Sequence, residues 1–249
     1  MGNIRITYLG HASVSLESRG TRILVDPMFS MRALFIKRAY PPPVKIPDMT
    51  GFNVVLLTHA HYDHMDIPTL RALDNSVLVI SAWNTSDIVR KAGKKDIIEM
   101  RPWQQVHIPG ATITATPAKH WGARNVYDFW RGYVGYIVTT EEATVYVAGD
   151  TGYGRHFNAI SRHSRIDVAC LPIGCYRPFW FRINHLSPSD SIKAFKDLGA
   201  EIMVPVHWGA FRLSLEALED PVKDLKEIMG ELPIKILNPG EGFTYSRSV

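Results

Sequence analysis

A histidine-rich stretch, Thr58-His59-Ala60-His61-Tyr62-Asp63-His64-Met65-Asp66, says more about this chain than any other segment. It follows an apolar run that predicts a buried strand, and it precedes a segment with helical spacing. If the chain is still extended at His59 and His61, their side chains point to the same side. Asp63 and His64 come after the expected turn, so they can face a second point nearby. The stretch therefore offers donors to two neighbouring centres.

Burying these imidazoles and the carboxylate costs free energy unless something binds them. The alternative is a solvated loop that happens to be rich in histidine. Histidine makes up only 10 of the 249 residues, so three within this short stretch is an improbable accident. We treat the motif as a hypothesis that its surroundings must support.

Three later strand-like segments each end in another nitrogen or oxygen donor. His120, Asp150 and His207 come directly after these segments. In α/β sheets, ligands bind beyond the carboxyl ends of the strands. We therefore expect these three side chains to meet the histidine-rich stretch at one edge of the fold.

Hydrophobic patterns predict a layered α/β protein. Strands are expected at residues 4–8, 14–16, 22–25, 54–57, 77–80, 111–116, 133–139, 145–148, 168–171 and 202–204. The continuous apolar runs indicate strands covered on both faces, whereas alternation at 111–116 and 133–139 predicts strands with an exposed face. Helices are expected at 67–73, 187–198 and 215–229, with an irregular loop at 28–43.

The composition indicates the broad class of protein. It is 46% hydrophobic and 21% charged, without a repeat or a flexible linker, which favours one domain over residues 1–249. Cys170 and Cys175 are expected to be free thiols, which fits a cytoplasmic protein. No leader is recognised, and no apolar run approaches the roughly 20 residues of a membrane span.

The order of these donors resembles the metallo-β-lactamase superfamily. The resemblance runs from Tyr8-Leu9-Gly10-His11 to His207-Trp208-Gly209 and implies a four-layer αββα sandwich with mixed sheets and a two-metal site. It implies that one metal is held by His59, His61 and His120, and the other by Asp63, His64 and His207. Asp150 is implied to bridge the two.

More narrowly, the chain is similar to the branch that contains the N-acyl-phosphatidylethanolamine-hydrolysing phospholipase D. The supporting stretches are Asp26-Pro27-Met28-Phe29-Ser30, His61-Tyr62-Asp63-His64-Met65-Asp66, Thr116-Pro117-Ala118-Lys119-His120-Trp121, Gly149-Asp150-Thr151-Gly152-Tyr153, Leu171-Pro172-Ile173-Gly174 and His207-Trp208-Gly209. The expected activity is therefore that of a metal-dependent phosphodiesterase of phospholipase D type.

The donor set bears on the metal and the reaction. All donors are nitrogen or oxygen, which fits two Zn²⁺ ions, with Mn²⁺ or Fe²⁺ as alternatives. Two divalent ions carry more positive charge than Asp63, Asp150 and a bridging hydroxide remove, which favours an anionic small molecule or lipid as substrate. A metal-bridging hydroxide suits attack at phosphorus, and Asp63 and His185 are the predicted catalytic residues.

Other functions stay open at this point. One is a lactonase or ester hydrolase acting on a phosphorylated small molecule, and another is a non-catalytic metal-binding or lipid-binding module. A nuclease is suggested by the net charge of +4 and the pI of about 9.0. No dense tract of lysine and arginine supports nucleic-acid binding, so no nucleic-acid partner is expected.

Several residues are expected to support the site. Asp26 resembles the acidic residue that orients a metal-bound histidine, although it could instead cap the turn at Met28 or Phe29. His11 is either close to the site or a buried structural histidine. His185 resembles the branch's active-site histidine that contacts substrate or protonates the leaving group. The remaining histidines, His107, His156 and His163, are expected on the surface.

Two loops that mix aromatic and basic residues are expected to form a substrate wall. One spans residues 28–40, and the other supplies the predicted substrate contacts Tyr176, Phe179, Trp180 and Arg182. Such loops suit an apolar substrate with a phosphate, or peripheral contact with a membrane. The alternative is that these side chains pack beneath the loops or hold a dimer together.

Overall fold

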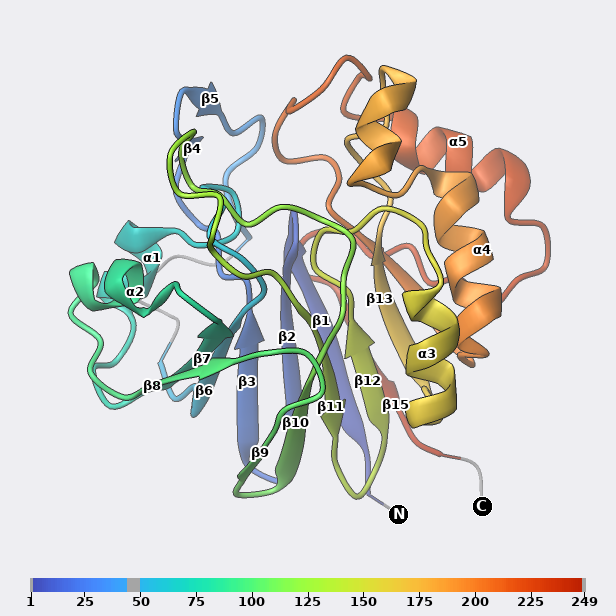
Figure 1. The fold of residues 1–249 in the computed structure, drawn as a ribbon. Coiled ribbons are helices and arrows are strands. Elements are labelled where there is room, and N and C mark those ends of the chain that lie inside the picture. The colour runs from blue at the N-terminus through green and yellow to red at the C-terminus, as the bar shows by residue number, and fades with distance from the viewer. Residues whose placement is uncertain (1, 44–49, 248–249) are drawn as a thin grey trace.

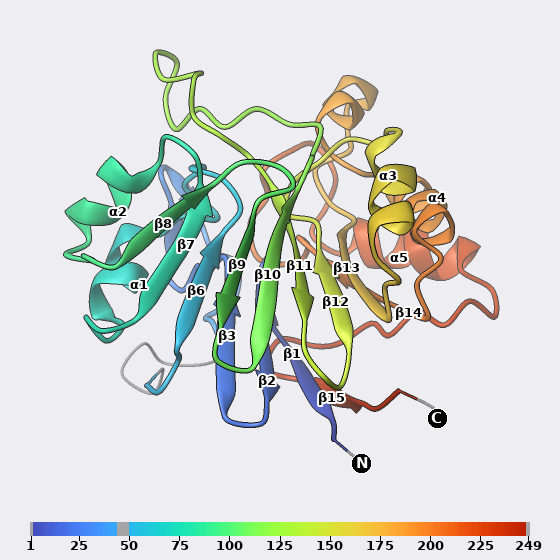
Figure 2. The same cartoon turned by 60° about the horizontal axis from the view of Figure 1, so that its bottom comes forward.

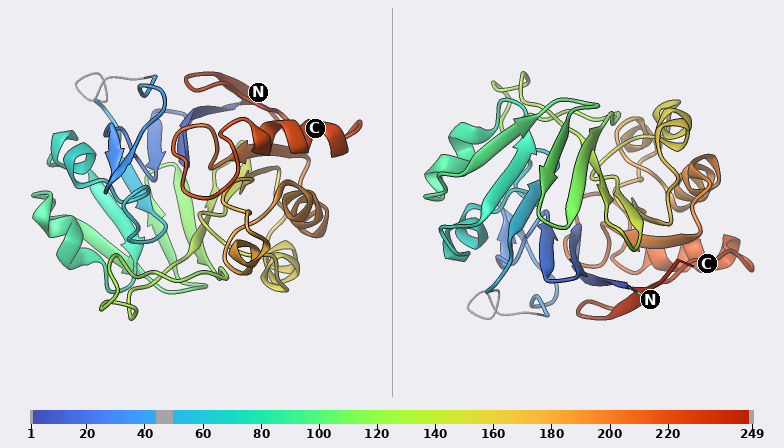
Figure 3. Two further views of the ribbon diagram at one scale, coloured as in Figure 1. Left: turned by 90° about the horizontal axis from the view of Figure 1, so that it is seen from above. Right: turned by 90° about the horizontal axis from the view of Figure 1, so that it is seen from below.

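Two large β-sheets face each other and carry helices on their outer surfaces in the computed structural model (Figure 1). The structure describes residues 2–43 and 50–247. The views from above and below show the two sheets between two groups of helices (Figure 3). This is the predicted four-layer αββα sandwich.

The first sheet has the strand order β15-β1-β2-β3-β6-β7-β8. Its strands are β1 (Ile4–Gly10), β2 (Ser13–Ser18), β3 (Thr21–Val25), β6 (Val54–Leu57), β7 (Leu78–Ala82), β8 (Ile97–Met100) and β15 (Gly242–Tyr245). β15, β1, β2 and β3 pair antiparallel, whereas β3, β6, β7 and β8 pair parallel. The sheet is therefore mixed, as predicted.

The second sheet has the order β14-β13-β12-β11-β10-β9. Its strands are β9 (Gln105–Ile108), β10 (Ala111–Thr116), β11 (Gly135–Thr139), β12 (Thr144–Val147), β13 (Val168–Pro172) and β14 (Ile202–Val206). β10 and β12 are both antiparallel to β11, so they run in the same direction, and β13 and β14 continue parallel to β12. The segments after β10, β12 and β14 therefore start at the same edge.

Helices cover the outer face of each sheet (Figure 2). α1 (Ile67–Ala72) and α2 (Ser86–Lys91) cover the first sheet, and α3 (His156–His163), α4 (Pro188–Leu198) and α5 (Asp220–Ile228) cover the second. A short 3₁₀ helix, η2 (Phe179–Ile183), precedes α4. Among the described residues, no helix is long and apolar enough to cross a membrane.

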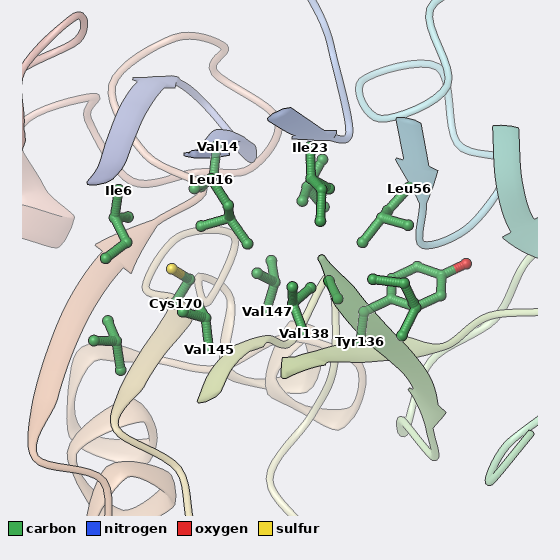
Figure 4. Close-up of a cluster of buried hydrophobic side chains, with 14 of the residues drawn as sticks. Ile6, Val14, Leu16, Ile23, Leu56, Tyr136, Val138, Val145, Val147 and Cys170 are labelled. Carbon is green, nitrogen blue, oxygen red and sulfur yellow. The ribbon is translucent and has the colours of Figure 1, made fainter. Parts of the chain in front are cut away.

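The main hydrophobic core lies between the two sheets (Figure 4). Ile6 and Leu16 from the first sheet face Val138 and Val145 from the second, and all four are essentially inaccessible to solvent. Separate apolar clusters lie between each sheet and its helices. Both faces of each sheet are therefore covered, which explains the continuous apolar runs in the sequence.

The structure corrects part of the sequence prediction. β10 and β11 do not have an exposed face, because all their residues except Thr139 are buried or half-buried. The opposite sheet covers one side of both strands, and Ile137 of β11 packs into the cluster beneath the helices. The segment expected to be irregular, 28–43, contains a small hairpin of β4 (Arg32–Ala33) and β5 (Ile36–Lys37). α2, α3, β8, β9 and β15 were not expected from the sequence.

The last helix begins later than predicted, at Asp220 rather than at residue 215. The reason lies in Glu216, whose buried carboxylate accepts hydrogen bonds from the backbone N–H groups of Cys175 and Arg177. This tertiary contact holds the residues before α5 in a loop, although their apolar spacing is helical.

Candidate metal centre

The histidine-rich loop leaves β6 and turns within a few residues. The backbone N–H of Met65 donates to the carbonyl of His61 over 2.8 Å, which closes the turn. Arg124 then clamps the loop, because its Nη1 donates to the carbonyls of Ala60 and Met65 over 2.8 and 2.9 Å. Its guanidinium also stacks over the ring of Tyr62, 4.0 Å from the centroid. This role of Arg124 was not predicted from the sequence, because the residue lies far along the chain from the loop.

Four donors converge in a first group. The donor atoms of His59, His61, His120 and Asp150 all lie within 4.8 Å of one another. His61 Nδ1 is 2.9 Å from His59 Nε2 and 3.3 Å from His120 Nε2. Asp150 Oδ2 is 3.9 Å from His59 Nε2. The sequence assigned these three histidines to one metal, and the fold brings them together.

A second group lies beside the first and consists of His11, Asp63, His64 and His207. Asp63 Oδ2 is 2.8 Å from His11 Nε2, 3.5 Å from His64 Nε2 and 3.3 Å from His207 Nε2. The predicted set of Asp63, His64 and His207 is therefore assembled, with His11 as an additional member.

Asp150 stands between the two groups. Its Oδ2 lies 4.0 Å from His120 Nε2 in the first group and 3.3 Å from His64 Nε2 in the second. Its Oδ1 lies 3.2 Å from His207 Nε2. This is the place that the sequence assigned to a bridging carboxylate.

The two groups fit divalent cations. Several of their converging atoms are buried and have no hydrogen-bond partner among the described residues, namely His64 Nε2, His207 Nε2 and Asp150 Oδ1. Unpartnered polar atoms are rare in protein interiors because their desolvation is costly. Converging imidazole nitrogens and carboxylates are the donors that metals such as Zn²⁺ accept. The donor chemistry thus supports two metal positions without fixing the metal's identity.

The donors come from both sheets. His11, His59, His61, Asp63 and His64 follow strands of the first sheet, whereas His120, Asp150 and His207 follow strands of the second. Each donor group therefore combines residues from both sheets. The site lies at the edge where the carboxyl ends of the strands meet, as the sequence predicted.

The outward nitrogen of several rings is also fixed. His64 Nδ1 donates to Asp26 Oδ2 over 2.8 Å. Thr58 Oγ1 donates to the same oxygen over 2.6 Å, so it can accept from His59 Nδ1 at 2.9 Å. His120 Nδ1 donates to the backbone carbonyl of Asn184 over 3.0 Å. Such contacts set the tautomer and orientation of metal-binding histidines.

Asp26 therefore lies where the sequence placed it, on a histidine of the site. The alternative, a turn cap, does not form, because the N–H groups of Met28 and Phe29 donate to the hydroxyls of Ser13 and Thr69 instead. Thr58 and the carbonyl of Asn184 were not expected from the sequence.

Burial and charge shape the protonation of the cluster. Burial would raise the pKa of Asp150, but positive charge on His207 and His64 holds it well below its usual range. Burial would lower the pKa of His64, but Asp150, Asp63 and Asp26 raise it to about 10. Burial lowers the pKa of His59, helped by His64 nearby. Without metal, His64 is thus a cation and His59 is neutral.

His185 lies beside the site, as predicted. Its Nε2 is 3.5 Å from Asp150 Oδ2, and its Nδ1 donates to the carbonyl of Phe181 over 3.2 Å. The side chain is 14% exposed, so it is open to solvent at the mouth of the site.

The predicted substrate contacts fall into two kinds. Phe179 and Trp180 are exposed on η2, which leads directly into His185. Tyr176 is buried, and its hydroxyl donates to Asp224 over 2.6 Å. Arg182 donates to both oxygens of Asp190 over 2.8 Å each. The structure thus gives Tyr176 and Arg182 partners within the protein.

Trp121 is a neighbour of the site that the sequence analysis did not assign. Its ring lies edge-on to the ring of His61, 4.9 Å between centroids, and about half of the side chain is exposed. Its position directly after His120 was the available signal.

The remaining histidines lie away from the donors. His107 and His163 are exposed, as expected. His156 is half-buried, which corrects the expectation of a surface residue, because its Nε2 contacts Thr151 Oγ1 at 3.1 Å.

Known proteins are similar to this chain in sequence and in fold. A family model described as a beta-lactamase superfamily domain matches residues 21–208. The chain belongs to the metallo-β-lactamase superfamily. The solved structure of a metallo hydrolase from Ignicoccus hospitalis is similar, with a TM-score of 0.77 at 23% identity, and the match covers 99% of this chain and 100% of that one. At that identity, the likeness shows the shared fold.

Relatives within the superfamily are similar over most of this chain. An uncharacterized protein of Mycobacterium tuberculosis is 30% identical over 89% of this chain and 63% of its own length, so the chain spans less than two thirds of that relative. The N-acyl-phosphatidylethanolamine-hydrolyzing phospholipase D 1 of Caenorhabditis elegans is 30% identical over 90% of this chain and 69% of its own length. A metal-dependent hydrolase of Methanopyrus kandleri is 28% identical over 96% and 99%. These names support the class of metal-dependent hydrolase.

Proposed function

We propose that this protein is a dinuclear metal-dependent phosphodiesterase that acts on an anionic substrate. The observation that carries the proposal is the position of Asp150 between two complete donor groups. A bound metal pair would supply Lewis acidity and an activated water nucleophile for attack at phosphorus. We propose Zn²⁺ as the metal, because all donors are nitrogen or oxygen.

The protein's own residues would position and protonate the substrate. Phe179, Trp180 and Trp121 offer apolar surface beside the site for an acyl or other apolar group. His185 faces the same opening and is proposed to protonate the leaving oxygen, while Asp63 is proposed to hold the second metal and the nucleophile in line. The phospholipase D name of the Caenorhabditis elegans relative supports a phosphodiester substrate.

The proposed location is the cytoplasm. Both cysteines, Cys170 and Cys175, are buried free thiols. Free thiols agree with a reducing compartment.

Metal analysis and a diester assay test the main proposal. The protein loaded with Zn²⁺ should hold two equivalents and hydrolyse bis(p-nitrophenyl) phosphate and N-acyl phospholipid vesicles. His61→Ala should reduce turnover by more than about 100-fold, because it removes a donor from the first group. His107→Ala, which changes an exposed histidine, should retain full turnover. Hydrolysis of lactones or carboxylic esters but of no diester would overturn the proposal, as would two bound metals with no turnover at all.

A series of leaving groups tests the proton donor. Hydrolysis of an alkyl diester releases an alkoxide, a poor leaving group that needs a proton. Hydrolysis of an aryl diester releases p-nitrophenolate, which leaves without one. His185→Gln should therefore slow alkyl diesters at least about 10-fold more than aryl diesters. Equal slowing of both would mean that His185 only binds or positions the substrate.

A further inference from the structure

A large cavity lies on the other side of His11 from the metal centre. Its volume is about 1020 Å³, and its walls include Arg38, Trp208, Val222 and Ile236. His11 lines the cavity but turns its Nε2 toward Asp63 in the second donor group. The cavity therefore lies beside the second donor group, and the imidazole ring of His11 separates it from Asp63.

Arg38 brings to this cavity a positive charge that no direct ion pair among the described residues neutralises, although the Asp66 carboxylate is close enough to act on it. The side chain is only 3% exposed, and its Nε and Nη1 donate to the carbonyls of Tyr40 and Met28 over 3.0 and 2.8 Å. Within residues 2–43 and 50–247, no carboxylate forms an ion pair with it. Buried charges are normally paired, and a guanidinium has more donors than two carbonyls accept. The free Nη2 edge can therefore take an anion.

The backbone next to Arg38 leaves room for that edge. Gly10 has φ +94°, and a Cβ there would lie 2.9 Å from Arg38 Nη2. The guanidinium carbon, Cζ, lies over the ring of Phe211, 5.2 Å from its centroid. This contact helps to hold the charge in place.

The rest of the cavity is largely apolar. Trp208 stacks on Tyr8, with 5.5 Å between ring centroids, and its Nε1 donates to the carbonyl of Pro205. This fixes the indole as a wall. Across from it, α5 buries Pro221 and Leu225 on one side and presents Val222 and the stem of Lys226 to the cavity. A fixed apolar wall beside a buried cation is suited to a ligand with a charged head and an apolar tail.

We propose that this cavity binds an amphiphile with an anionic head, a carboxylate or a phosphate monoester, on an alkyl chain. The head pairs with Arg38, and the chain lies along Trp208, Val222 and Ile236. The Lys223 and Lys226 ammonium groups at the rim add positive charge, although Glu219 and Glu227 also line it. The site adjoins the metal centre at His11 but does not depend on the proposed phosphodiesterase activity.

Calorimetric titration of the intact protein tests the proposal. Dodecanoate, dodecyl phosphate, dodecanol and acetate are each added below their micellar concentrations, to chelator-treated and to Zn²⁺-loaded protein. At least one anionic chain should bind both forms, with an affinity at least about 10-fold above those of dodecanol and acetate. The comparison of dodecanoate with dodecyl phosphate identifies the head. Equal affinity for dodecanol, or binding of neither anionic chain, would refute the proposal.

Variants locate the site. Arg38→Met should remove the preference for the anionic chains over dodecanol. Val222→Glu places a carboxylate against the alkyl chain and should weaken binding at least about 10-fold; because Val222 is half-buried at the edge of an apolar cluster, a thermal melt checks that the variant folds. Ile228→Glu, on the same helix but outside the cavity, is the matched control and should bind like the parent protein. If Arg38→Met does not fold, the affinity of Val222→Glu for the anionic chains tests the proposal. Unchanged affinity in that variant would mean that the ligand binds elsewhere.

Discussion

At the residue scale, three histidines of the candidate centre, His59, His64 and His120, have one nitrogen held by the protein and the other directed at the donors. For His64, the holding residue is Asp26, which also accepts hydrogen bonds from the backbone and hydroxyl of Thr58. One carboxylate thus orients His64 directly and His59 through the hydroxyl of Thr58. The same design leaves little room for substitution, because both oxygens of Asp26 accept hydrogen bonds from the site.

Replacing Asp26 by asparagine should weaken metal binding. An asparagine amide has only one oxygen, and its NH₂ group would face a group that itself donates. Either His64 Nδ1 or Thr58 would therefore lose its acceptor. Outer contacts of this kind contribute about 10-fold to 100-fold to metal affinity. Competition with a chromophoric chelator measures the change. Asp96→Asn alters an exposed carboxylate in the same way and should leave the affinity unchanged. Equal affinity of both variants would contradict the assigned role of Asp26.

The protonation of His64 predicts a pH dependence of metal binding. Its pKa is raised to about 10 in the metal-free protein, so the ring carries a proton at neutral pH. A metal must displace this proton, and affinity should therefore rise with pH up to about 10 and fall as the pH decreases. Titration calorimetry in buffers of different ionisation enthalpy would detect the released proton. Metal binding at pH 7 without proton release would show that His64 is already neutral.

At the element scale, the loop after β6 depends on contacts with a distant segment. Arg124 comes from the long connection between β10 and β11, yet it closes the histidine-rich loop by binding two of its carbonyls. The ligand loop therefore does not hold its shape by local hydrogen bonds alone.

Arg124→Met should destabilise the protein and loosen the metal centre. Hydrogen bonds from a charged donor contribute about 1.5–3 kcal/mol, and the two carbonyls would lose their partner. Urea unfolding of the metal-free protein should show a loss of that order, together with weaker metal binding. Arg162→Met, at an exposed position on α3, should change neither. A loss of stability with unchanged metal affinity would mean that the loop keeps its shape without the clamp.

Several elements and donors were predictable because their signals are local. Strands such as β6 and β13 are continuous apolar runs, and His120, Asp150 and His207 stand at strand ends where ligands gather. α2 and β9 are short and carry weak periodicity. The N-terminus of α2 depends on Glu99, a residue of β8, whose carboxylate accepts from the N–H groups of Thr85 and Ser86. A contact between separate elements of this kind leaves no mark in the local pattern.

Some of the residues that support the site could likewise be predicted from local sequence, and others could not. Asp26 was recognisable from the Asp-Pro turn after its strand. Asn184 contributes only a backbone carbonyl to His120, and any residue could supply that group. Arg124 and Trp121 lie in a connection whose path over the site follows from the tertiary structure. The donors could therefore be predicted from the identity of their side chains, whereas the residues that support them could be identified only from the folded structure.

At the scale of the whole molecule, bound metal should stabilise the native state. The donor groups assemble only when the protein is folded, so metal binding favours folding by mass action. At a free metal concentration about 100-fold above the dissociation constant, the gain is about 2.7 kcal/mol per site. Adding a chelator should therefore lower the melting temperature in a calorimetric scan. The effect should be smaller in His61→Ala, and a melting temperature that chelation leaves unchanged would contradict the two metal positions.

The division of the donors between the sheets also constrains when the protein can acquire metal during its synthesis. When the ribosome has released only the first sheet up to β8, neither donor group is complete, since His120, Asp150 and His207 are still to come. Nascent chains should therefore capture ions poorly until β14 has emerged. Loading is expected to be a late event, and a shortage of metal in the cell would affect finished molecules rather than growing ones.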